Sequence, residues 1–138
     1  MFISVSSFAY TAQEALRAVK DYRPYTNSYE SIETISAIYA TRVFYEYDFK
    51  TWLYSKLTDN IFIVTSVFSV GKPKSEVLEK LPELVQEEIK KAGNELRLDW
   101  RVDMNNEEVR PHNYLAKDSL SLYEKMIEML GVTLHKRF

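Results

Sequence analysis

The amino-acid sequence predicts an α+β fold: a single domain with a mainly antiparallel sheet, a β-meander, and about three helices packed on it. Residues 95–104 alternate apolar and charged side chains, the pattern of a strand with one buried and one solvated face. Residues 61–70 are rich in β-branched and aromatic side chains, which favour strands. The expected order is strand, helix, two or three meander strands, helix, strand, helix, which is that of an α+β domain.

The length and composition fit one globular domain. The chain has 138 residues, of which 46% are hydrophobic and 28% charged, close to the average for a soluble protein. These values exclude disordered, collagen-like and low-complexity chains. We assign residues 1–131 to the domain and regard residues 132–138 as a basic C-terminal tail. The tail is expected to be loose unless Val132, Leu134 and Phe138 dock on the domain.

The first elements are expected to be a strand and a helix. Residues 2–8 have the composition of a short strand. Thr11 and Glu14 then have the spacing of a capping box, in which the hydroxyl accepts from the amide three residues on and the carboxylate reaches back. Apolar residues follow at helical spacing, and Pro24 disfavours the helical conformation in the residue before it. We therefore predict a helix over residues 12–22.

Residues 32–57 fit two patterns. Read as a strand, alternate side chains share one face, and the aromatic and β-branched content favours this interpretation for residues 35–47. Read as a helix, apolar side chains recur every three or four residues, so residues 32–40 also fit a helix. Two further strands are expected at residues 52–57 and 61–70, with turn residues between them. Together these segments make a three-stranded antiparallel meander.

The second half of the chain supplies helices and a charged strand. Residues 75–92 are amphipathic, but Pro82 breaks an interior hydrogen bond, so the helix either begins near this proline or kinks there. The strand over residues 95–104 is followed by turn residues, after which residues 107–110 can pair back. A last helix is expected over residues 119–130. The density of oppositely charged residues and the absence of cysteine would suit a thermophilic protein.

Residue counts exclude several classes of functional site. The chain has no cysteine, which excludes disulfide frameworks and thiolate-bound zinc or iron–sulfur clusters. It has three glycines, each where a helix or strand is expected to end, which excludes phosphate-binding loops and dinucleotide fingerprints. We therefore expect no cofactor. No apolar run approaches the roughly 20 residues that a membrane helix needs. The N-terminus also lacks the pattern of a secretory signal, so a cytoplasmic location is expected.

The main candidate site is the aromatic stretch between residues 44 and 54. In a regular strand Tyr45, Tyr47 and Phe49 lie on one face, and the aromatic residues of opposite parity lie on the other. A small sheet needs only one apolar face, so the second face is expected to be covered. The cover is either the protein's own helices, a second subunit, or a ligand that stacks on the rings. The candidate binding residues are Arg42, Phe44, Tyr45, Tyr47, Phe49, Trp52 and Tyr54.

A second candidate site lies on the charged face of residues 95–104. Asp99 and Asp103, with His112 in the following loop, are the only residues that we consider for catalysis, as ligands of a divalent metal. Arg97 and Arg101 alternate with these aspartates and are expected to pair with them in competition with a cation. A solvated strand face with charges that protect a sheet edge is therefore the favoured interpretation, and no metal site is assigned.

The leading hypothesis is a small non-catalytic interaction module, a homodimer or adaptor that uses an aromatic sheet face. It follows from the excess of aromatic area and from the missing catalytic and cofactor motifs. One alternative is nucleic-acid or nucleotide binding by aromatic stacking, with Arg42 and Lys50 at the phosphates, although a formal net charge of −2 is unlike a bulk nucleic-acid binder. The other alternative is a metal-dependent hydrolase or nuclease that uses Asp99, Asp103 and His112.

Overall fold

The computed structural model describes residues 9–138, so the strand expected at residues 2–8 lies outside the described part of the chain. The elements follow in one order along the sequence. They are α1 (Ala12–Lys20), α2 (Ile32–Val43), β1 (Tyr47–Lys56), β2 (Ile61–Val70), α3 (Ser75–Leu78), α4 (Glu83–Ala92), β3 (Glu95–Asp103), β4 (Glu108–Pro111) and α5 (Tyr114–Glu128). The α+β class is confirmed, with five helices in the described residues instead of about three.

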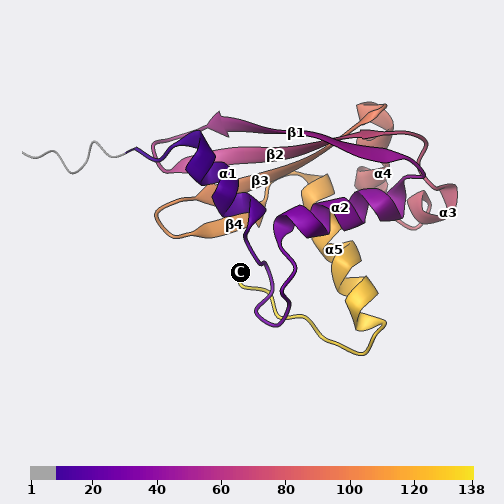
Figure 1. The fold of residues 1–138 in the computed structure, drawn as a ribbon. Helices are drawn as coiled ribbons and strands as arrows, with labels where there is room; N and C mark the ends of the chain where they lie inside the picture. Colours follow the sequence, from indigo (N-terminus) through magenta and orange to yellow (C-terminus); the bar gives the residue numbers. More distant parts are fainter. Residues whose placement is uncertain (1–8) are drawn as a thin grey trace, which may run out of the picture.

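The four strands form one antiparallel meander in the order β1-β2-β3-β4. The helices pack on one face of this sheet, which we call the helix-side face; in Figure 1 α2 and α5 lie below the strands. Alternate residues of β2 and β3 point into the core there, and Trp100 of β3 is fully buried. The alternation predicted for residues 95–104 is therefore confirmed, and residues 108–111 pair back as a fourth strand.

The main correction concerns residues 35–47, which we expected to be a strand. Most of this segment belongs to α2, whose first turn is capped by the Ser31 side chain. Ile35, Tyr39 and Val43 are almost completely buried, and their spacing is that of a helix packed on a core. Aromatic and β-branched content reports packing as much as backbone preference, so the composition of this segment was misleading.

The other helices begin and end for local reasons. The capping box at Thr11 and Glu14 is present at the start of α1. Pro82 divides residues 75–92 into α3 and α4 and occupies the N-cap of α4, because it has no N–H to donate within a helix. Asn113 caps α5, which therefore begins earlier than the predicted residue 119. None of the helices in residues 9–138 is long and apolar enough to cross a membrane.

The C-terminal segment runs along the loop between α1 and α2. Lys136 forms a bridge with Tyr25, and the Arg137 amide donates to the carbonyl of Pro24. The Asn27 side chain binds the backbone on both sides of Leu134, with distances of 2.8 Å and 2.9 Å. These contacts hold residues 132–138 against the domain.

A buried polar contact joins α2 to α5. The Tyr39 hydroxyl donates to Asp118 Oδ2 at 2.8 Å, and both side chains are buried. Burial raises the pKa of the Asp118 carboxyl, and the hydrogen bond from Tyr39 opposes that shift in part. Burial and the neighbouring carboxylate also raise the pKa of Tyr39.

We expect this contact to make stability depend on pH in a defined direction. A carboxyl whose pKa is higher in the folded state binds more protons folded than unfolded, so its effect on stability becomes less favourable as the pH rises above its unfolded pKa of about 3.9. Asp118→Asn keeps an acceptor for Tyr39 and does not titrate. Its free energy of unfolding should therefore increase relative to the wild type as the pH rises from about 4 to about 8.

The measurement is urea unfolding across that pH range, with the exposed Asp48→Asn as the control. Tyr39→Phe leaves the buried carboxylate without its partner and should destabilise the fold by about 1–3 kcal/mol at neutral pH, and by less in acid. A constant difference between wild type and Asp118→Asn at every pH would contradict this account.

Candidate functional site

The candidate site lies on β1, an edge strand whose pairing with β2 contains a bulge at Lys50. Phe49 pairs with Phe68 and Thr51 with Val67, so the register shifts by one residue between them. An extra residue reverses the alternation of side chains between the two faces. The rings before and after the bulge therefore point to the same face. They are Tyr47, Phe49, Trp52 and Tyr54, and we call them the aromatic strip.

The expected division of the aromatic residues between two faces is therefore wrong. The members of the aromatic strip pair with Val70, Phe68, Ser66 and Val64 of β2, which all point to the helix-side face. Phe49 contacts Phe68 edge to face with 5.6 Å between the ring centroids, and it lies 5.9 Å from Trp52. The strip is thus a lateral continuation of the core along the edge of the sheet.

The helices leave most of this continuation uncovered, although Trp52 is partly buried against the core. Tyr47, Phe49 and Tyr54 keep 41%, 51% and 61% of their surface exposed, whereas β2 beside them is buried for most of its length. Leu53 is exposed on the opposite face of the same strand, and Leu57, just after the strand, is exposed as well. Contiguous apolar patches of this kind are uncommon on monomeric proteins and mark interaction sites.

The remaining predicted binding residues lie apart from the strip. Phe44 is buried at the end of α2 and forms a bridge with Pro73. Arg42 lies on the exposed side of α2. Tyr45 is exposed, and the Lys74 ammonium lies 5.8 Å from its ring centroid.

The lysines of β1 are paired with carboxylates. Lys50 Nζ lies 3.1 Å from Glu95 Oε2, and Lys56 Nζ lies 3.4 Å from Asp59 Oδ1. The Lys50 and Arg97 contacts lower the pKa of Glu95, with the hydrogen bond from Arg97 as the largest cause. Each lysine thus lies beside a carboxylate that offsets its charge, so the strip is not flanked by a net positive patch for a nucleic acid.

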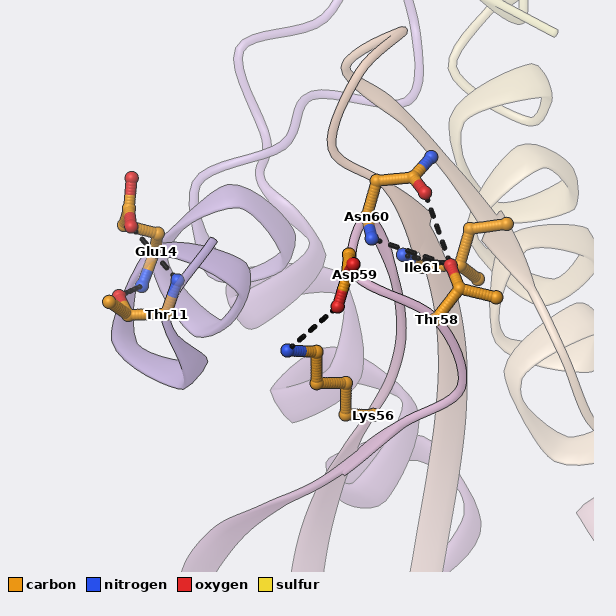
Figure 2. A network of polar contacts seen from close by, with 7 residues as sticks. All are labelled: Thr11, Glu14, Lys56, Thr58, Asp59, Asn60 and Ile61. Carbon is orange, nitrogen blue, oxygen red and sulfur yellow. Dashed lines mark hydrogen bonds and ion pairs between the residues drawn. The ribbon is translucent and has the colours of Figure 1, made fainter. Parts of the chain in front are cut away.

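A turn held by side chains ends the strip. Figure 2 shows Thr58 Oγ1 accepting from the amides of Asn60 and Ile61 at 3.3 Å and 3.1 Å, next to the Lys56–Asp59 pair. The Leu57 amide donates to the Ile61 carbonyl at 2.9 Å and closes the β1–β2 hairpin. This hydrogen-bonded turn defines where the edge of β1 ends.

The aspartates considered for catalysis lie on the other face of the sheet and have separate structural roles. Asp99 accepts from Thr65 at 2.6 Å, and Asp103 accepts from Asn60 and from the turn after β3. Burial acts to raise the pKa of Asp103, but the hydrogen bonds from Asn106 and Asn60 outweigh it and lower the pKa. Four residues of strand separate the two carboxylates by roughly 13 Å, too far to share one cation.

His112 does not complete a metal site. Its backbone amide donates to the Asp99 carbonyl at 2.8 Å in the middle of β3, so His112 lies beside Asp99 and not beside Asp103. The arginines of β3 were expected to pair with the aspartates, but Arg97 binds Glu95 instead. Within residues 9–138 no group of three or more histidine, aspartate or glutamate side chains is placed to hold a metal ion.

A groove of about 920 Å³ lies between α1, the β3–β4 hairpin and the C-terminal segment. Sequence patterns do not indicate this groove, because its lining comes from three distant parts of the chain. Arg17 and Arg137 line it together with Asp21 and Glu107. This mixture of charges selects neither an anion nor a cation, and no ligand class follows from it.

None of the protein-family models, curated proteins or solved structures compared with the chain matches it. The function is therefore argued from the residues and their geometry alone.

The separation of Asp99 from Asp103 predicts that the protein binds neither Mg²⁺ nor Mn²⁺ with defined stoichiometry. Each carboxylate already accepts hydrogen bonds, and a divalent ion would have to replace them without gaining a second carboxylate ligand from this pair. Isothermal titration calorimetry with MnCl₂ should give only heats of dilution. Binding of one ion per chain that is lost in Asp99→Asn would contradict this prediction.

Proposed function

We propose that this protein is a small non-catalytic interaction module, a homodimer or adaptor that binds another protein chain through the aromatic strip of β1. The observation that supports the proposal most is the bulge at Lys50, which brings four rings onto one face of an edge strand that the helices leave exposed. Tyrosine and tryptophan are favoured anchors of protein interfaces, because each covers a large area with few rotatable bonds.

The two edges of the sheet differ in a way that favours this reading. β4 is a four-residue edge whose Arg110 and Glu108 form an ion pair, and short charged strands are a common protection against edge pairing. β1 is a ten-residue edge with apolar side chains on both faces. β1 is therefore the longer and more apolar of the two edges and the better suited to contact with another chain.

The expected strength of such a contact is modest. Covering about 100 Å² more of each exposed ring, at about 25 cal/mol per Å², contributes roughly 2.5 kcal/mol per ring. Association itself costs about 4–15 kcal/mol of lost freedom. The strip therefore supports a reversible complex, and neighbouring contacts are needed for a tight one.

We expect the protein to associate in solution and the strip to carry that association. Light scattering should give a mass near twice 16.2 kDa that persists from low to high salt, because apolar contacts are not screened. The double variant Tyr47→Ser/Tyr54→Ser should weaken the dimer at least about tenfold in dissociation constant, equivalent to about 1.4 kcal/mol.

The matched control is Tyr29→Ser/Tyr114→Ser, which removes two exposed tyrosines outside β1 and should leave the mass unchanged. Thermal unfolding of both double variants checks that they fold. A dimer that is insensitive to Tyr47→Ser/Tyr54→Ser, or a wild type that stays monomeric and binds no partner through this face, would count against the proposal.

The stacking alternative leads to a different expectation. Because carboxylates beside Lys50 and Lys56 offset their charges, the protein is expected not to bind single-stranded DNA or RNA. Adding the protein to labelled DNA or RNA should leave the fluorescence anisotropy unchanged at both about 50 and about 200 mM NaCl. Binding that weakens steeply with salt would instead favour nucleic-acid recognition through the rings.

A further inference from the structure

The outer edge of β1 is free for pairing in the described residues. β1 pairs only with β2, and no strand within residues 9–138 lies on its other side. Ten residues is long for a strand. The edge carries Asp48, Lys50 and Lys56, but residues 51–55 between the two lysines have no charged side chain.

The hydrogen bonds of the β1–β2 hairpin show which N–H and C=O groups of β1 point away from β2. The Leu57 amide donates to Ile61, so Leu57 is a hydrogen-bonded position of the β1–β2 ladder. These positions alternate in an antiparallel pair, so the N–H and C=O groups of Lys56, Tyr54 and Trp52 point away from β2. Three residues on this side of the bulge thus offer a donor and an acceptor each.

The bulge limits how far a partner strand can continue. The extra residue at Lys50 interrupts the ladder, so residues 51–57 are the longest regular segment of the edge. A partner that pairs with this segment needs about seven extended residues with the same regular spacing. A second copy of the same segment has that length.

Only one two-fold register uses every outward peptide group of this segment. When Tyr54 lies opposite Tyr54 of a second copy, Trp52 lies opposite Lys56 and Lys56 opposite Trp52, and each pair exchanges two hydrogen bonds. A two-fold axis at Leu53 leaves Lys56 without a regular partner. An axis at Lys56 places two like charges opposite each other, which is unfavourable.

The side chains are complementary in the same register. On the helix-side face the Lys56 ammonium meets the face of Trp52, a favourable cation–π arrangement, and the two Tyr54 rings adjoin each other. On the opposite face Leu53 meets Ser55, and Thr51 meets Leu57. The exposed Lys56–Asp59 pair is weak enough to be exchanged for the new contact.

We infer that the chain forms a homodimer by antiparallel pairing of the two β1 edges over residues 51–57, with the two-fold axis at Tyr54. This inference rests on the proposed function and deepens it by naming the partner and the mode of contact. The interface is isologous, the eight strands form one continuous sheet, and the helices of both copies lie on the same side. The two aromatic strips then join end to end across the axis.

Single cysteines test the register, because the natural chain has none. Opposed residues of a hydrogen-bonded pair have Cα atoms about 5.5 Å apart, within the range of a disulfide. Tyr54→Cys should therefore oxidise to a covalent dimer at least about ten times faster than Ser55→Cys, which is also exposed but faces Leu53 of the second copy. Leu53→Cys is the second control, and preferential cross-linking there would overturn the register.

A proline tests the role of the backbone. Tyr54→Pro removes an N–H that points away from β2, so the β1–β2 ladder keeps its hydrogen bonds. Tyr54→Thr removes the same ring but keeps the N–H. Light scattering should show a clear loss of dimer for Tyr54→Pro relative to Tyr54→Thr, with thermal unfolding as the check that both fold. Equal dissociation of the two variants would overturn edge pairing.

The outcomes separate this inference from the proposed function. A dimer that Tyr47→Ser/Tyr54→Ser dissociates, with equal cross-linking at residues 53, 54 and 55, overturns edge pairing and leaves the strip as the interface. If the double variant remains dimeric and Tyr54→Cys still cross-links preferentially, edge pairing is supported. The aromatic strip then does not carry the association. A monomeric wild type overturns the inference, including the case in which another segment of the chain or a different protein covers the edge.

Discussion

The antiparallel pairing of β1 with β2 contains one extra residue at Lys50, and the exposed surface of the protein depends on it. In a strand without a bulge the rings on either side of Lys50 would point to opposite faces, two beside the core and two beside the charged face. The bulge places all four on the helix-side face, where Phe49 and Trp52 contact the core. One inserted residue thus turns scattered aromatic side chains into one continuous surface.

The two faces of the sheet have different structural roles. The helix-side face holds the core, built around Trp100 and closed by α2 and α5, which Tyr39 and Asp118 join by a buried hydrogen bond. The opposite face of β3 carries Arg97, Asp99 and Asp103, each already bound to a neighbouring side chain. Chemistry that needs free carboxylates therefore has little support there, whereas within residues 9–138 no strand pairs with the outer edge of β1.

The core contains three buried polar side-chain atoms without a hydrogen-bond partner in the described residues. They are Ser36 Oγ, Ser66 Oγ and Trp100 Nε1. Each such atom costs about 1–3 kcal/mol relative to a satisfied one. The surrounding apolar burial offsets this, and the core is therefore held by packing more than by its polar network.

The sequence by itself determined the elements whose signals are local. The capping box of α1, the alternation of residues 95–104 and the break at Pro82 each depend on neighbours within a few residues, and all three are present. The sequence also determined which cofactor loops are impossible, since three glycines and no cysteine exclude them. Only the tertiary structure decided that residues 32–43 form a helix, because both periods fit and the core selected one. It also decided the bulge at Lys50, since strand register is set by the partner strand and leaves no mark on the sequence of β1.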